Sequence, residues 1–201
     1  MDPAPDFNRI VSEYEGRIVR YLATLLEDPV LARDLAQETF LKVHRGLDQL
    51  RNPEARTAWI YRIASNLAFD HLRSRTSRQE GQSLSLEGEF LHGDGVEPTV
   101  ASEELSAEGR IEQEEMAECL RHYIYHLPEA SRACLILRDL EGLGEEAVAE
   151  ILGCSVGAVK VRTHRARKLL RERLREGCRF YQDERGVLRC EPSGAPQEGR
   201  E

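Results

Sequence analysis

Long apolar runs are absent from this 201-residue sequence, and that absence limits where the protein can act. No run reaches the ~18 consecutive apolar residues that identify a membrane-spanning helix. The opening residues, MDPAPDFNRI, lack the basic-then-apolar pattern of an export signal. We therefore expect a cytoplasmic protein with no direct membrane insertion.

Cysteine is scarce as well, with five residues in the chain, an odd number. Without an export signal, five thiols favour a reducing compartment over a disulfide framework. Cys119, Cys134 and Cys154 fall on or beside apolar stripes of expected helices, so we interpret them as small buried hydrophobic side chains. Cys178 and Cys190 lie apart from these stripes, near the C-terminus.

Patterns for metal binding or nucleophilic catalysis are also missing. His122 and His126 are the one histidine pair spaced i, i+4, and no third ligand or nucleophile stands at a convincing distance along the chain. A surface pair is the better interpretation. A hydrolase that uses histidines and carboxylates is therefore disfavoured.

The chain has fewer basic than acidic residues, but the excess of acids is confined to one segment. The formal net charge is −8, and Glu80–Glu118 alone contains twelve acids and one base, Arg110. That segment therefore carries −11, and the remainder of the chain carries +3. The average hides a basic C-terminal region, so a nucleic-acid partner is not excluded.

The basic region lies in Gly144–Glu176, which has the pattern of a helix, a tight turn and a second helix. Gly153 suits the left-handed end of the first helix, and Ser155 suits the N-cap of the second. Between Lys160 and Arg175 the second helix carries one acid, Glu172, and eight bases. The bases are Lys160, Arg162, Arg165, Arg167, Lys168, Arg171, Arg173 and Arg175. A basic second helix after a short turn is typical of a helix-turn-helix that enters the DNA major groove, although a solvated face is the alternative.

Apolar periodicity predicts further helices and no extended sheet. The spacing of apolar residues is helical over 7–26, 30–47, 53–74, 110–126 and from Pro128 to about Leu140. Asp28-Pro29, Pro53 and Pro128 suit helix starts. The fold class is therefore all-α. On the second of these helices Asp34, Gln37, Glu38 and Lys42 share a polar face, which would ordinarily be a solvated surface.

The helix over 53–74 combines cations with aromatic and amide groups. We expect its outer side to bear Trp59, Tyr61 and Asn66 with five arginines, although burial in the core is the preferred interpretation for Trp59. The arginines are Arg56, Arg62, Arg73, Arg75 and Arg78. Cations interleaved with aromatics can follow a phosphate chain and stack on unpaired bases. Asn66 either bonds internally or contacts a base edge.

Two segments do not follow the helical pattern. Residues 79–109 are acidic and rich in polar residues, glycine and serine, which predicts a flexible linker. After Gly177 the period changes, and a hairpin around Asp183–Gly186 would bring Cys178 and Cys190 together. Those two thiols could form a disulfide or half of a metal site, or be inert cysteines in a disordered tail; no cofactor is certain.

Taken together, the sequence resembles the extracytoplasmic-function (ECF) sigma factors, small members of the bacterial sigma-70 family. The resemblance covers residues 7–175 apart from the linker, and three motifs carry it. They are DLAQETFLKVHRGL (34–47), AWIYRIASNLAFDHLR (58–73), and LPEASRACLILRDLEGL (from 127) followed by the helix-turn-helix. Their order along the chain is that of the family.

The resemblance implies a function in transcription initiation. Such a protein is a dissociable specificity subunit, not an enzyme by itself, with core RNA polymerase and promoter DNA as partners and an anti-sigma factor as the usual control. It implies a polymerase-binding surface and a surface that recognises and opens the −10 element. The polymerase-binding residues would be Asp34, Gln37, Glu38 and Leu41. The −10 residues would be Leu50, Arg62, Asn66, Arg73 and Arg75, with Asn66 facing an extruded base.

The helix-turn-helix would read the −35 element. The residues that match base-facing positions are Lys160, Val161, His164 and Arg165, and those nearer phosphates are Arg162, Arg167 and Lys168. Some members of the family carry C-terminal cysteines that sense metal or redox state, which would suit Cys178 and Cys190. The resemblance thus divides the chain into region 2 (1–78), linker (79–109), region 4 (110–176) and a cysteine-bearing tail (177–201).

Two features depart from the family pattern, and one rival function stays open. Gly144 stands where a Ser or Thr helix cap is usual, and the tail lies outside the two-domain plan. A simple repressor or activator would use the same two-helix reader, normally as a dimer and without polymerase. The motif at 34–47 argues against that alternative.

Overall fold

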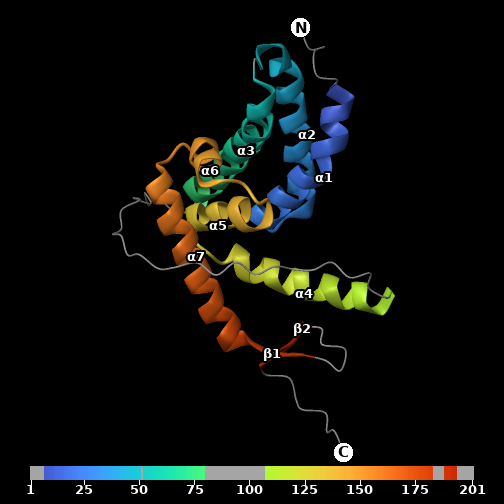
Figure 1. Ribbon diagram of the computed structural model, residues 1–201, viewed down its shortest axis with the longest axis vertical. Coiled ribbons are helices and arrows are strands. Elements are labelled where there is room, and N and C mark those ends of the chain that lie inside the picture. The colour runs from blue at the N-terminus through green and yellow to red at the C-terminus, as the bar shows by residue number, and fades with distance from the viewer. Residues whose placement is uncertain (1–6, 51, 80–106, 183–187, 194–201) are drawn as a thin grey trace, which may run out of the picture.

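The computed structural model describes residues 7–50, 52–79, 107–182 and 188–193 (Figure 1). These residues form an all-α fold with one short hairpin, as predicted. The α-helices are α1 (Phe7–Leu26), α2 (Pro29–Gly46), α3 (Arg56–Gln79), α4 (Ala107–Tyr125), α5 (Glu129–Leu135), α6 (Glu145–Leu152) and α7 (Val156–Gly177). The 3₁₀ turns η1 (Leu47–Gln49) and η2 (Pro53–Ala55) precede α3, and the π-helical stretch η3 (Ile136–Leu140) continues α5.

Helices α1, α2 and α3 form an N-terminal bundle. Asp28 caps α2, because its carboxylate accepts hydrogen bonds from the backbone N–H groups of Val30 and Leu31, and Pro29 occupies the first turn. Two hydroxyl pairs join α1 to α3: Tyr14 with Thr57 at 2.7 Å and Tyr21 with Ser65 at 2.8 Å. The bundle therefore fixes which face of α3 points outward.

Helices α4 to α7 form the C-terminal half, and they pack directly on the bundle. In Figure 1, α5 and α6 lie at the lower end of α1 and α3, and α7 descends beside them. The buried apolar side chains form one continuous core that runs from Ile18 and Leu25 in α1 to Ile136, Val148 and Val159 in the C-terminal half. Two predicted halves thus share one core in this structure.

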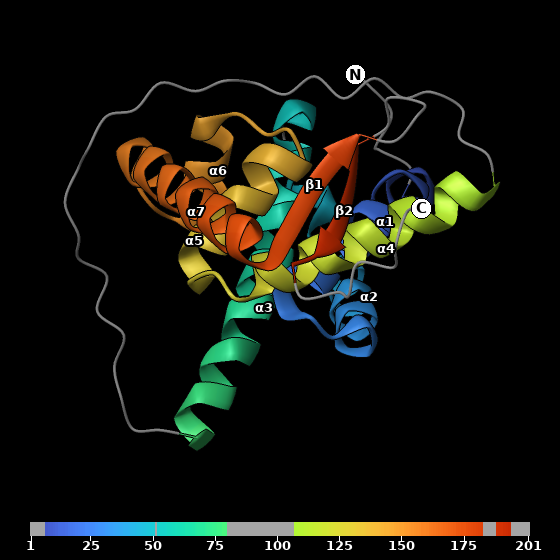
Figure 2. The ribbon, with the colours of Figure 1, turned by 90° about the horizontal axis from the view of Figure 1, so that it is seen from below.

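The C-terminal hairpin follows α7 without a break. Strand β1 (Cys178–Gln182) pairs antiparallel with β2 (Leu188–Pro192), and Phe180 lies opposite Cys190. Because side chains alternate between faces along a strand, Cys178 and Cys190 share a face, offset by two residues. Figure 2 shows the hairpin beside α4 at the end of α7. The predicted turn, 183–186, lies outside the described residues.

Three expectations need correction or limitation. Tyr61, expected on the outer side of α3, is fully buried. Helix α4 begins at Ala107, before the expected start at Arg110, and residues 80–106 of the predicted linker lie outside the described part of the chain. Cys134 is buried as predicted, whereas Cys119 and Cys154 are only half-buried. None of the described helices has the length and apolar content needed to cross a membrane.

Candidate nucleic-acid and polymerase interfaces

The turn between α6 and α7 is built as the sequence predicts. Gly153 ends α6 in the left-handed region, at φ 61°, and its N–H donates to the carbonyl of Ala149. The Ser155 hydroxyl caps α7 by accepting a hydrogen bond from the Ala158 N–H at 3.1 Å. Buried residues Val159 and Thr163 then fix the rotation of α7 about its axis. The opposite face of α7 is therefore presented to solvent.

Most side chains predicted to read the −35 element lie on that outer face. Val161 and Arg162 are half-buried, and the others are exposed. The exposed residues are Lys160, His164, Arg165, Arg167 and Lys168. Arg162 differs from them because its guanidinium lies near the buried thiol of Cys134. Burial raises the pKa of Cys134 to about 12, and the nearby Arg162 partly offsets that rise.

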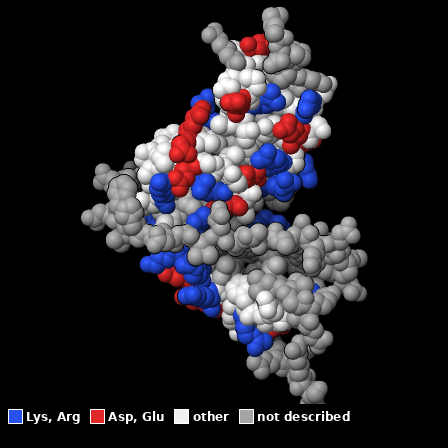
Figure 3. Space-filling model, in the orientation of Figure 1, with Lys and Arg blue, Asp and Glu red and all other residues white. Residues whose placement is uncertain are grey.

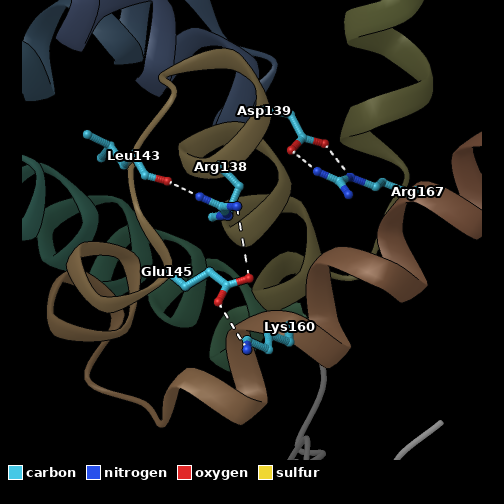
Figure 4. Close-up of polar contacts among 6 residues, drawn as sticks. All are labelled: Arg138, Asp139, Leu143, Glu145, Lys160 and Arg167. Atoms are coloured by element: carbon cyan, nitrogen blue, oxygen red, sulfur yellow. Dashed lines mark hydrogen bonds and ion pairs between the residues drawn. The ribbon is translucent and has the colours of Figure 1, made fainter. Parts of the chain in front are cut away.

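Carboxylates of the preceding segment pair with two of the exposed cations (Figure 4). Arg167 makes two hydrogen bonds to Asp139, at 2.8 and 2.6 Å, and these bonds raise its pKa. Lys160 Nζ lies 3.4 Å from one Glu145 oxygen, and the other Glu145 oxygen lies 3.9 Å from Arg138. Arg138 also donates to the carbonyl of Leu143. Two cations of α7 therefore already form ion pairs with acids of the C-terminal half.

The residues predicted to contact −10 DNA lie along α3 and the loop before it. Asn66, Arg73 and Arg75 are exposed, and Leu50 is half-buried where η1 ends. Arg73 pairs with Asp70 on the same helix. Arg62 is exposed, with its guanidinium 3.7 Å from Glu150 of α6. The structure therefore brings these residues to one helix and its preceding loop, but α6 packs against the same helix.

The predicted polymerase-binding residues share one exposed face of α2. Asp34, Gln37, Glu38 and Leu41 all point to solvent, because Leu35, Ala36 and Phe40 turn the other face inward. Leu41 is 58% exposed, an apolar side chain on a polar face. Glu38 pairs with Lys42 at 3.4 Å. Protein interfaces have an apolar centre and a polar rim, but one exposed leucine does not by itself identify an interface.

A cluster that the sequence did not reveal joins the two halves. Glu141, just after η3, accepts a hydrogen bond from Arg17 Nε at 3.3 Å and another from the Tyr61 hydroxyl. Burial raises the pKa of Tyr61 most, and the Glu141 charge and hydrogen bond raise it further. Spacing along the chain could not identify this cluster, because its three residues come from α1, α3 and the loop before α6.

The tail thiols lie against α4. Cys178 is buried, and its thiol donates to the Tyr123 hydroxyl at 3.7 Å. Cys119 of α4 and Cys190 of β2 both interact with Cys178, and burial followed by that interaction raises the pKa of each. A Cβ atom at Gly177 would meet the Tyr123 oxygen at 1.9 Å, so any other residue there would require the Tyr123 side chain to move. Among the described residues, no set of three or more His, Cys, Asp or Glu side chains is placed to hold a metal ion.

The surfaces have different chemical characters. Figure 3 shows Lys and Arg side chains gathered over α7 and acidic side chains over α6. A positively charged helix suits duplex DNA when side chains near its N-terminus can hydrogen-bond to the edges of the bases. An exposed amide flanked by arginines suits unpaired bases, and the face of α2 suits a protein. His122 lies outside these three surfaces. It pairs with Glu27 at 2.8 Å, a contact between the two halves.

Comparison with known families identifies two matched segments. Residues 10–78 match the family Sigma-70 region 2, and residues 117–170 match Sigma-70, region 4. The RNA polymerase sigma-H factor of Pseudomonas aeruginosa is 34% identical over 165 residues, covering 82% of this chain and 83% of that protein. The ECF RNA polymerase sigma-E factor of Haemophilus influenzae is 30% identical over 168 residues, covering 84% and 87%.

Solved structures give the same fold. The sigma factor RpoE of Bartonella quintana, determined in complex with the anti-sigma factor NepR, aligns with a TM-score of 0.62 at 23% identity and covers 85% of this chain and 97% of its own. CnrH, determined in complex with the cytosolic domain of CnrY, aligns with a TM-score of 0.58 at 22% identity, covering 84% and 87%.

Proposed function

The chain belongs to the sigma-70 family as an RNA polymerase sigma factor of the ECF type, and from this premise we propose how its surfaces divide the work. Residues 1–78 act as region 2 and residues 110–176 as region 4, joined by the linker 79–109 and followed by the tail 177–201. The observation that carries the proposal is that three unlike surfaces occur on one chain: the exposed face of α2, the amide and arginines of α3, and the basic face of α7.

The face of α2 binds core RNA polymerase in this proposal. Asp34, Gln37 and Glu38 supply charge and hydrogen bonds around the exposed Leu41. An apolar centre within a polar rim supports a protein contact that forms and dissociates. The chain contributes specificity and no catalytic group of its own, and it works in the cytoplasm, where the polymerase is.

Promoter DNA contacts α3 and α7 in two chemically different ways. On α3, Asn66 captures an unpaired −10 base near Leu50, while Arg62, Arg73 and Arg75 attract the strand. On α7, Lys160, Val161, His164 and Arg165 face −35 base edges in the major groove, with Arg167 and Lys168 on phosphates. Arg162, which is half-buried near Cys134, is the third residue proposed to lie near phosphates.

An anti-sigma factor is the proposed inhibitor. The fold is that of two sigma factors whose structures were determined with anti-sigma partners. A partner that covers the face of α2 or the basic face of α7 would block one of the proposed contacts.

Runoff transcription tests this function. Purified core polymerase is supplied with a promoter library from the source genome, with and without this protein. We expect new start sites that share a two-part upstream motif. Binding of DNA by the protein alone, with no new starts in the presence of polymerase, would instead indicate a simple repressor or activator.

We also propose that the tail controls transcription by this protein in response to metal or redox state, through Cys178 and Cys190. The thiol of Cys178 interacts with those of Cys119 and Cys190, which supports a metal- or redox-responsive group at the end of α7. The test compares runoff transcription by the parent and a Cys178→Ser, Cys190→Ser variant, with added zinc and with reductant or oxidant. An equal response of the two proteins would remove the proposal.

A further inference from the structure

Four acids of one short segment each pair with a cation. The segment runs from Asp139 to Glu150 and comprises the end of η3, the turn before α6 and most of α6. Its pairs are Asp139 with Arg167, Glu141 with Arg17, Glu145 with Lys160, and Glu150 with Arg62. Two of the four cations belong to the N-terminal bundle and two to the reading helix α7. The segment therefore neutralises cations on both sides of the junction between the halves.

Glu141 occupies the most enclosed of these positions. Its side chain is 9% exposed, and it holds both Arg17 of α1 and the hydroxyl of the fully buried Tyr61 of α3. The Arg17 guanidinium also lies over the rings of Tyr14 and Tyr61, at 5.6 and 5.7 Å from their centroids. A charged hydrogen bond shielded from water resists salt better than an exposed pair. Glu141 is thus the polar contact best placed to fasten the two halves.

The other three acids pair with cations that are proposed to contact DNA. Arg62, Lys160 and Arg167 are each proposed to contact DNA, and each faces a carboxylate here. Phosphates bind such cations with release of condensed counterions, so a carboxylate already in place competes with them. In addition, α6 packs on α3 beside Arg62, which leaves less room for a strand along that helix.

We propose that Glu141 latches the protein in a closed state, in which the 139–150 segment competes with DNA for the cations of α3 and α7. Release of Glu141 from Arg17 and Tyr61 lets the C-terminal half leave the bundle and frees Arg62. DNA phosphates then replace the carboxylates at Lys160 and Arg167. The DNA half of this inference rests on the proposed function; the closure of the two halves does not.

A pair of substitutions with opposite effects on charge tests the latch. Glu141→Gln removes an acid, and Arg17→Gln removes a cation, yet both break the same ion pair. Glu146→Gln is the control, because Glu146 is exposed on α6 and no ion pair is recorded for it among the described residues. The full-length proteins carry a donor and an acceptor dye at Arg45 of α2 and Glu172 of α7, both exposed sites. Energy transfer between the dyes reports the separation of the halves.

The latch predicts that both Glu141→Gln and Arg17→Gln lower the energy transfer, whereas Glu146→Gln leaves it at the parent value. Binding of a duplex of arbitrary sequence by the free protein is measured next, at low salt. If the open fraction rises from about one tenth to about one half, apparent affinity rises ~5-fold in both latch variants. A pure charge effect would strengthen binding by Glu141→Gln and weaken it in Arg17→Gln.

The outcomes separate this inference from the proposed function. Unchanged energy transfer in both latch variants, with native circular dichroism, overturns the latch even if the parent protein directs transcription. Reduced energy transfer without any gain in DNA affinity overturns the competition. A parent protein that directs no transcription refutes the proposed function, while the energy-transfer result still decides whether Glu141 closes the molecule.

Discussion

Asn66 is an exposed amide on a helix whose neighbouring turns bury Ile63, Ala64 and Leu67 at least in part. An exposed amide adds nothing to that packing, so replacing it should leave the fold intact. We expect Asn66→Ala to impair promoter opening, because an unpaired base would lose the group that holds it outside the stack. Permanganate reactivity of −10 thymines in the holoenzyme complex measures this. Wild-type reactivity in the variant would rule out the assigned contact.

Tyr61 gives a pH dependence at the same scale. Burial, then the Glu141 hydrogen bond, raises the pKa of Tyr61 above its ordinary value, so folding favours the neutral phenol. The contribution of Tyr61 to stability is therefore complete below about pH 10, the ordinary tyrosine pKa, and declines as the pH rises beyond it. The free energy of unfolding in urea, measured from about pH 8 to about pH 11, should fall more steeply for the parent than for Tyr61→Phe. Parallel curves would contradict this, and the buried Tyr21 provides the same background in both proteins.

Single residues also show where prediction from sequence stops. The side chain of Asn66 is exposed, as the helical period predicted. Tyr61 was misplaced because its burial depends on Glu141 and Arg17, which arrive from other elements. The proximity of Arg162 to Cys134 was not predicted for a related reason: the two residues are distant in sequence.

At the scale of elements, α6 begins without a side-chain cap. Gly144 has φ −63° and ψ 156°, an extended conformation that serine adopts readily, and a Cβ atom there would make only an ordinary contact with Glu146 at 3.7 Å. Gly144→Ser should therefore stabilise the protein by about 0.5–1 kcal/mol through a cap and a less flexible unfolded chain. Thermal unfolding measures the change. The opposite experiment removes the existing cap of α7, and Ser155→Ala should lower stability by ~1 kcal/mol. A destabilised Gly144→Ser protein would show that the cap does not form.

Helix α7 should show a division between base and phosphate contacts. Lys160→Ala should cost about 1–3 kcal/mol on the preferred −35 sequence and relax discrimination at one position. Lys168→Ala should weaken binding to all −35 sequences alike and reduce the slope of log K against log salt by about 0.9. Binding titrations of the holoenzyme on matched and mismatched promoters distinguish the two. Equal loss on every sequence for Lys160→Ala would move that residue to the phosphates.

The helices themselves were predictable, and their ends mostly so. Asp28-Pro29, Gly153 and Ser155 are local signals that act within a few residues, and each marks an end as expected. The π-helical stretch Ile136–Leu140 was not predicted, because its apolar pattern is the same as that of an ordinary helix. Leu140, at the end of this stretch, is 53% exposed.

For the whole molecule, the main finding is that both halves share one core. Residues of α1, α3, α5 and α6 belong to a continuous set of buried apolar side chains. We therefore expect the closed state to unfold in a single cooperative transition in calorimetry, with equal calorimetric and van't Hoff enthalpies, although the family matches cover two separate segments. Two resolved transitions in the parent protein would show that the halves are independent in solution.

The arrangement of the halves was beyond the reach of the sequence. Motif order indicated two helical units and their contents, but contacts such as Arg17 with Glu141 span most of the chain and leave no periodic trace. The proximity of Cys178 to Cys119 is another case, since α5, α6 and α7 separate α4 from β1 along the chain. Long-range polar contacts therefore had to come from the structure.

The most direct test of the central claim is site-specific photo-crosslinking in the complete promoter complex. A photoreactive amino acid replaces Asn66 in one protein and His164 in another, and each is assembled with core polymerase on a promoter found by runoff transcription. The account predicts that position 66 crosslinks to the non-template strand at −10 and position 164 to the duplex at −35. Crosslinks from both positions to one element, or none from either in an active complex, would contradict it.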